Sequence, residues 1–121
     1  MDSLNIQGTK DTPSVLFIKD KGILMIAGRS IPENPILFYT PILDEVKEFA
    51  KGTKALLLSL ELEYMNTSSA KFLKDIIRTA KEGKGGILVT WIYEEDDEKM
   101  LETGKYLEEM LQVPFEFRET L

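Results

Sequence analysis

The stretch that decides the fold reads Ala55-Leu-Leu-Leu-Ser-Leu-Glu-Leu-Glu-Tyr-Met-Asn-Thr-Ser-Ser-Ala-Lys-Phe72. Its first half is an apolar run that predicts a buried strand, and apolar residues from Phe72 to Ala80 follow at helical spacing. Between the two segments lie four consecutive residues of the types that cap helices: Asn66, Thr67, Ser68 and Ser69. The stretch therefore predicts a strand, a hydroxyl-rich turn and a helix.

The hydroxyl-rich turn has two interpretations. It is either an ordinary helix cap with spare serines or a phosphorylation switch, because the unpaired N–H groups of a helix start favour negative charge. A phosphate on Thr67 would add that charge together with three acceptor oxygens. Backbone N–H groups can bind those oxygens, so the modification need not disturb the fold.

Composition limits the chemistry available to the chain. The 121 residues predict one domain spanning 1–121, and 43% apolar with 30% charged residues predict a folded core. Cysteine and histidine are absent, which removes thiol chemistry, the commonest general base and the commonest metal ligand. A net charge of −6 argues against nonspecific nucleic-acid binding. No apolar run reaches the length of a membrane span and the N-terminus does not resemble a signal peptide, so we expect a cytoplasmic protein with no membrane partner.

Upstream of the decisive stretch, residues 1–12 form a polar segment in which Leu4 and Ile6 alternate as in a short edge strand. Residues 14–19 and 23–27 have strand composition, and the Gly22 turn between them predicts an antiparallel hairpin. Residues 28–35 then predict a loop stiffened by two prolines, either a rigid crossover or a preshaped docking loop. The residues of this loop that could contact a partner are Ser30, Pro32, Glu33 and Asn34.

The other elements follow from periodicity and breakers. Thr40-Pro41 predicts the start of a helix that ends near Gly52. Residues 87–93 predict a strand, and the five acids of residues 94–98 suit the start of a further helix. These acids lack the glycine-punctuated spacing of a calcium loop, so we expect no metal site. Pro114 ends the helix before a last short strand at residues 115–118.

The resulting order, β-β-α-β-α-β-α-β, predicts an α/β domain whose mixed, mostly parallel sheet is packed by helices. Functional sites in such sheets gather at the carboxyl ends of strands, where the turn from Asn66 to Ser69 is expected.

Catalysis has little support in this sequence. Without histidine and cysteine, a hydrolase would need Lys, Glu or Asp as the base for Thr67 or Ser68. Glu61 and Glu63 precede the turn and Lys71 follows it, although alternating glutamates usually form a solvated stripe. The sequence contains no nucleotide-binding fingerprint and indicates no cofactor, yet a small-ligand or nucleotide site at the same turn stays an alternative. The predicted helix after the turn carries Lys71, Lys74 and Arg78 at spacings of three and four, as either a solvated face or a surface for an acidic partner.

Four motifs carry a resemblance to a known family. They are residues 64–71 (Tyr-Met-Asn-Thr-Ser-Ser-Ala-Lys), residues 28–34 (Gly-Arg-Ser-Ile-Pro-Glu-Asn), Gly8-Thr9 with Thr12-Pro13, and Trp91-Ile-Tyr93 with the acids that follow. Together they resemble the SiaC family of bacterial regulatory phosphoproteins, whose fold is similar to the STAS domains of anti-sigma-factor antagonists. The resemblance covers nearly the whole chain.

The resemblance implies a non-enzymatic partner switch. Thr67 takes the position of the phosphoacceptor, with Ser68 and Ser69 as secondary candidates. A cognate Ser/Thr kinase would add the phosphate and a PP2C-type phosphatase would remove it. The unphosphorylated form would bind a downstream target, which in the best-known system is a diguanylate cyclase that controls biofilm formation. We expect Asn66, Lys71, Lys74 and Arg78 to border the docking face, and the loop from Ser30 to Asn34 to form its second edge.

Overall fold

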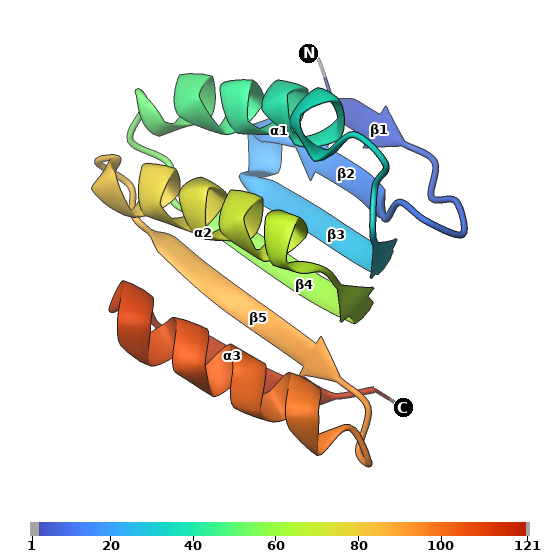
Figure 1. Cartoon of the computed structure of the whole chain (residues 1–121). Coiled ribbons are helices and arrows are strands. Elements are labelled where there is room, and N and C mark those ends of the chain that lie inside the picture. Colours follow the sequence, from blue (N-terminus) through green and yellow to red (C-terminus); the bar gives the residue numbers. More distant parts are fainter. Residues whose placement is uncertain (1–2, 121) are drawn as a thin grey trace.

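The computed structural model describes residues 3–120 of the chain, whose strands and helices alternate after an initial set of three strands (Figure 1). The elements in order are β1 (Leu4–Ile6), β2 (Ser14–Ile18), the short 3-10 helix η1 (Lys19–Lys21), β3 (Ile23–Ser30), α1 (Pro35–Ala50), β4 (Leu56–Met65), α2 (Thr67–Glu82), β5 (Ile87–Tyr93), α3 (Glu98–Leu111) and β6 (Phe115–Glu119). The predicted α/β order is confirmed, and so is the edge strand at Leu4–Ile6. Among residues 3–120, no helix is long and apolar enough to cross a membrane.

The six strands lie side by side in chain order, from β1 to β6. The pairs β1–β2 and β2–β3 are antiparallel, and the three later pairs are parallel. The change of direction follows from the connections. Gly22, with a φ of 68°, closes the tight turn between β2 and β3. Each later pair of strands is joined through a helix, as parallel pairing requires.

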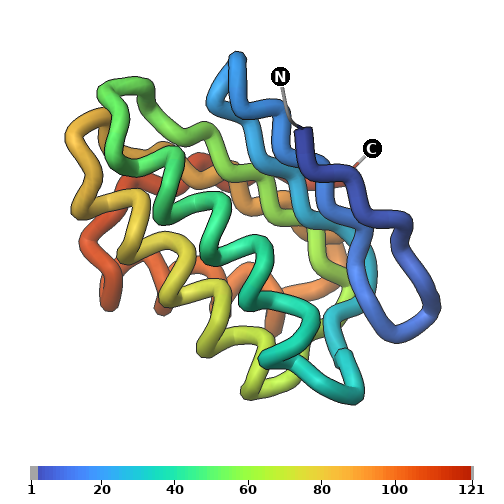
Figure 2. Tube along the Cα trace, turned by 90° about the horizontal axis from the view of Figure 1, so that it is seen from above, coloured from blue at the N-terminus to red at the C-terminus, as the bar shows by residue number. Residues whose placement is uncertain are grey.

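The three helices cover one face of the sheet (Figure 1), and α1 and α2 run side by side on it when seen from above (Figure 2). Right-handed crossovers that always step in the same direction place every helix on the same face. Strand β4 shows the result. Leu58 and Leu60 point into the core and are buried, while Leu57 and Glu61, on the opposite face, are exposed. The other face of the sheet is therefore open to solvent.

Helix α3 is held against the sheet by a close contact with β5. The Trp91 indole N–H donates a hydrogen bond of 2.9 Å to the Met100 carbonyl oxygen. One turn further along α3, a Cβ atom on Gly104 would lie 2.6 Å from the Trp91 ring. Only a residue without a side chain lets the helix approach so closely, which fixes the position of the α3 N-terminus beside the end of β4.

The structure corrects the predicted boundaries around α1. The helix begins at Pro35 and not at Pro41, because the Asn34 side chain caps it by accepting a hydrogen bond of 3.1 Å from the Leu37 N–H. Pro41 lies inside the helix. Gly28, Arg29 and Ser30, which the sequence placed in a loop, extend β3, so only residues 31–34 connect the strand to the helix.

Candidate functional site

The candidate site lies where β4 ends and α2 begins. Asn66 is the N-cap of α2, and its side-chain oxygen accepts a hydrogen bond of 2.9 Å from the Ser69 N–H. Its own backbone N–H donates to the Ser30 carbonyl oxygen at 3.1 Å. Thr67 is thus the first residue of the helix. The sequence predicted a turn before the helix, whereas in the structure the three hydroxyl residues form the first turn of the helix itself. These bonds fix the helix start against the end of β3.

The three hydroxyl side chains have different environments. Thr67 and Ser68 are exposed, whereas Ser69 is 0% exposed. The helical rotation of about 100° per residue separates them, because it turns Ser69 towards the core and leaves Thr67 in solvent. The prediction that Ser69 is a secondary phosphoacceptor is therefore wrong for this structure, because its hydroxyl is not accessible. The hydroxyls of Thr67 and Ser68 remain accessible to a kinase.

A chain of buried hydroxyl groups lies beneath the exposed turn. The Tyr39 hydroxyl donates to Ser30 Oγ at 2.5 Å, and Ser30 Oγ donates to Ser69 Oγ at 2.7 Å. Ser69 Oγ in turn donates to the Ser30 carbonyl oxygen at 2.9 Å. Burial raises the pKa of Tyr39, and its hydrogen bonds with the two serines offset this only in part. The phenol consequently stays neutral and can act as the donor at the start of the chain.

This network joins the starts of α1 and α2, and sequence analysis missed it. The Tyr39 ring also stacks on Phe72 of α2, with ring centroids 5.4 Å apart. Because α1 was predicted to begin after Tyr39, no helical periodicity indicated that this side chain faces the core. The two serines lie 39 positions apart in the sequence, so no local pattern could pair them.

The loop predicted as a second docking edge is buried in part. Ser30 is 0% exposed and Pro32 is also buried, so the prediction that their side chains contact a partner is wrong for this structure. Glu33 and Asn34 are exposed, although the Asn34 side chain caps α1. The next turn provides an apolar surface instead, because Ile36 and Leu37 are 67% and 72% exposed. The sequence did not reveal them, since it placed this turn before the helix.

The basic residues of α2 lie in line with Thr67. Residues 67, 71, 74 and 78 follow each other at spacings of four, three and four, which places them along one side of the helix. Lys71 and Arg78 are exposed and Lys74 is half-buried. Arg78 approaches Asp75 at 3.8 Å, but Lys71 and Lys74 form no ion pair with any residue between positions 3 and 120. A free positive stripe therefore starts at Thr67.

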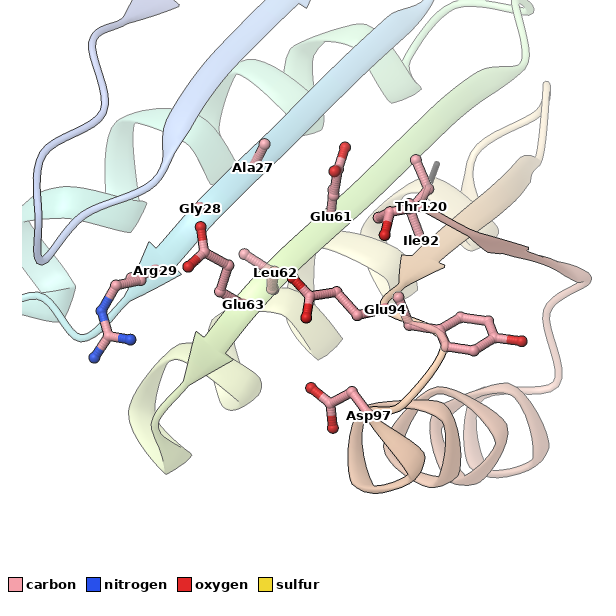
Figure 3. Close-up of a pocket in the computed structure, with 11 residues that line it drawn as sticks. Ala27, Gly28, Arg29, Glu61, Leu62, Glu63, Ile92, Glu94, Asp97 and Thr120 are labelled. Carbon is pink, nitrogen blue, oxygen red and sulfur yellow. The ribbon is translucent and has the colours of Figure 1, made fainter.

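On the open face of the sheet, near the site, lies an acidic hollow of about 640 Å³ (Figure 3). Carboxylates of Glu61, Glu63, Glu94 and Asp97 line it, together with Arg29 from β3. Glu61 and Glu63 are exposed on this face, as a solvated stripe on a strand would be. Within the described part of the chain, no set of three acidic side chains is arranged to hold a metal ion.

The fold and the site define a class of small α/β domain in which an exposed hydroxyl opens a helix at the carboxyl end of a central parallel strand. The sequence profile of the SiaC family, described as regulatory phosphoproteins, matches residues 6–120. The chain belongs to the SiaC family.

Relatives and solved structures agree with that assignment. The uncharacterized protein PA14_02130 of Pseudomonas aeruginosa (strain UCBPP-PA14) is 34% identical over 119 residues, which cover 95% of this chain and 94% of that protein. The crystal structure of apo-SiaC from Pseudomonas aeruginosa superposes with a TM-score of 0.87 at 32% identity, covering 98% and 99% of the two chains. A third match is the SiaC chain in the complex of the Pseudomonas aeruginosa diguanylate cyclase SiaD with its activator SiaC, with a TM-score of 0.89, 31% identity and coverage of 97% and 99%.

Proposed function

We propose that this chain is a non-enzymatic adaptor that binds and regulates a diguanylate cyclase, and that phosphorylation of Thr67 releases the cyclase. The observation that carries the proposal is the position of Thr67. It is exposed at the first position of α2, while Asn66 and Ser69 on either side are engaged in hydrogen bonds that fix the turn. The phosphate would act on a docked protein, because the groups that hold the fold together are already paired.

The proposed partners follow from this chemistry and from family membership. A cognate Ser/Thr kinase phosphorylates Thr67, and a PP2C-type phosphatase restores the hydroxyl. The diguanylate cyclase is supported by the SiaC relative that is crystallised with the cyclase SiaD and is described as its activator. Activation by the unphosphorylated form would make cyclic di-GMP output depend on the phosphorylation state of Thr67.

The docking face that we propose surrounds Thr67. Ile36 and Leu37, exposed at the start of α1, provide apolar contact area on one side. Lys71 and Lys74, which have no ion pair among the described residues, provide charge on the other. A phosphate placed between these two parts would oppose an acidic partner by repulsion and would exclude apolar side chains by its bulk.

The experiment compares binding of the diguanylate cyclase encoded in the same genome to the unmodified protein and to Thr67→Asp. We expect Thr67→Asp to weaken binding by at least tenfold while the melting temperature stays within about 2 °C, because exposed substitutions change stability little. Thr53→Asp is the matched control, since it makes the same substitution at an exposed position in the connection between α1 and β4. Equal affinity of Thr67→Asp, of the Thr67-phosphorylated protein and of the unmodified protein would refute the switch.

The ligand-binding alternative predicts a different result from the same proteins. A nucleotide that binds the turn would raise the melting temperature of the unmodified protein in a saturable way and would not stabilise Thr67→Ala.

A further inference from the structure

A second feature beside Thr67 is a small apolar groove of about 340 Å³ between the end of β4 and the starts of α2 and α3. Its walls include Thr67 itself and come from two separate segments, residues 63–70 and 97–103, which is why no local sequence pattern indicated it. The lining residues that matter here are Tyr64, Met65, Thr67, Ala70 and Met100. Tyr64 is 48% exposed, and the Arg29 guanidinium carbon lies 5.6 Å from the centroid of its ring.

The shape and lining of the groove suit a protein side chain. Its volume lies at the small end of the range for ligand pockets. Met65 and Met100 have flexible thioether side chains that adapt to apolar partners of different shape. Two acids also line the groove. The Asp97 carboxylate caps α3 by accepting a hydrogen bond of 3.0 Å from the Met100 N–H, and Glu63 lies exposed at the edge.

The charge next to the groove specifies the partner further. The stripe formed by Thr67, Lys71, Lys74 and Arg78 leads away from the groove along α2 for about 16 Å, at 1.5 Å per residue. At the groove itself, the exposed Lys99 lies among the same lining residues as the carboxylates of Glu63 and Asp97, so the positive charge belongs to the stripe on α2. The protein as a whole has a net charge of −6, so this stripe is a local exception that complements an acidic segment.

We propose that the groove receives one large aliphatic side chain of the effector, and that acidic residues following it in the effector pair with Lys71 and Lys74. This inference rests on the proposed function and names the chemistry of the partner at that site. It also explains the action of the phosphate. A phosphate on Thr67 narrows the mouth of the groove and pairs with Lys71, one helical turn away, so it opposes the anchor and the acidic residues together.

The test uses a random twelve-residue peptide library displayed on phage and selected on the unmodified full chain. We expect the enriched peptides to share a large aliphatic residue followed by two or more Asp or Glu residues. The best peptide is then labelled, and its affinity is measured by fluorescence anisotropy at low and at high salt. Selection of peptides without this motif, or of none, overturns the inference.

Groove and stripe are tested by separate variants. Ala70→Leu fills the groove without changing charge and should weaken the peptide at least tenfold, with Thr53→Leu as an exposed control. Lys71→Glu combined with Lys74→Glu should weaken it at least tenfold and reduce the salt dependence, with Lys47→Glu on α1 as the control. Circular dichroism checks that each variant is folded, and unchanged affinity in folded Ala70→Leu overturns the inference.

The results separate the two proposals. If Ala70→Leu abolishes peptide binding and Thr67→Asp does not change it, the groove stands and the phosphorylation switch fails. If Thr67→Asp releases the cyclase and Ala70→Leu does not, the switch stands and the groove fails.

Discussion

Removal of the Ser69 hydroxyl tests the buried network most directly. In Ser69→Ala, the Ser30 hydroxyl loses its acceptor at 2.7 Å in a position that is 0% exposed. The Ser30 carbonyl oxygen stays paired, because it still accepts the hydrogen bond of 3.1 Å from the Asn66 N–H. The only group that the substitution leaves without a partner is therefore one buried hydroxyl donor. Such a group costs about 1–3 kcal/mol. We therefore expect the free energy of unfolding to fall by about 2 kcal/mol.

The expected change in melting temperature follows from the length of the chain. Unfolding entropies near 60 °C are about 2.1 cal/mol/K per residue, which gives roughly 0.25 kcal/mol/K for this protein. A loss of about 2 kcal/mol then corresponds to roughly 8 °C. Thr67→Ala, two positions away but exposed, should shift the melting temperature by less than about 2 °C.

Differential scanning calorimetry of the unmodified protein and three variants provides the measurement. Tyr39→Phe is expected to fall between the other two, at about 1 kcal/mol, because Ser30 Oγ loses a donor but keeps its acceptor. The network reasoning would be refuted by a melting temperature of Ser69→Ala that equals that of Thr67→Ala.

Two further predictions concern the core. Gly104→Ala would place a Cβ atom 2.6 Å from the Trp91 ring, so we expect the shifted α3 to cost about 1–3 kcal/mol in chemical denaturation and to change the near-ultraviolet circular dichroism of Trp91. The raised pKa of Tyr39 predicts that unfolded chains lose this proton first as pH rises above 10.0. The native state then binds more protons, so its stability should fall with rising pH in that window, and Tyr39→Phe should show a smaller fall in denaturant titrations at pH 9 and 11.

The sequence predicted most of the fold because its signals are local. The apolar alternation of β4, the Gly22 turn and the break at Pro114 each specify their element without reference to distant residues. The error at α1 is physical as well. Pro41 favours a helix start, but it is tolerated inside this helix, and Asn34 with Pro35 makes an equally good cap six residues earlier.

The site was predictable only in part for the same reason. The hydroxyl turn is contiguous in sequence, so Asn66 and Thr67 could be identified from it. The burial of Ser69 and Ser30 depends on the contact between α1 and α2, and the groove depends on the distance that Gly104 allows between α3 and β5. Neither the contact between the helices nor the distance between α3 and β5 produces a periodic pattern of residues in the sequence.

The place of Thr67 in the first helical turn bears on how such a switch can act without a conformational change. Asn66 satisfies the Ser69 N–H through its side chain and the Ala70 N–H through its carbonyl oxygen. The N–H groups of Thr67 and Ser68 precede the first helical hydrogen bond, so they remain available to phosphate oxygens. The helix dipole favours the added charge at this end. Because a phosphate on Thr67 would find these partners already in place, its free-energy cost would fall on a docked protein and not on the sheet or the core.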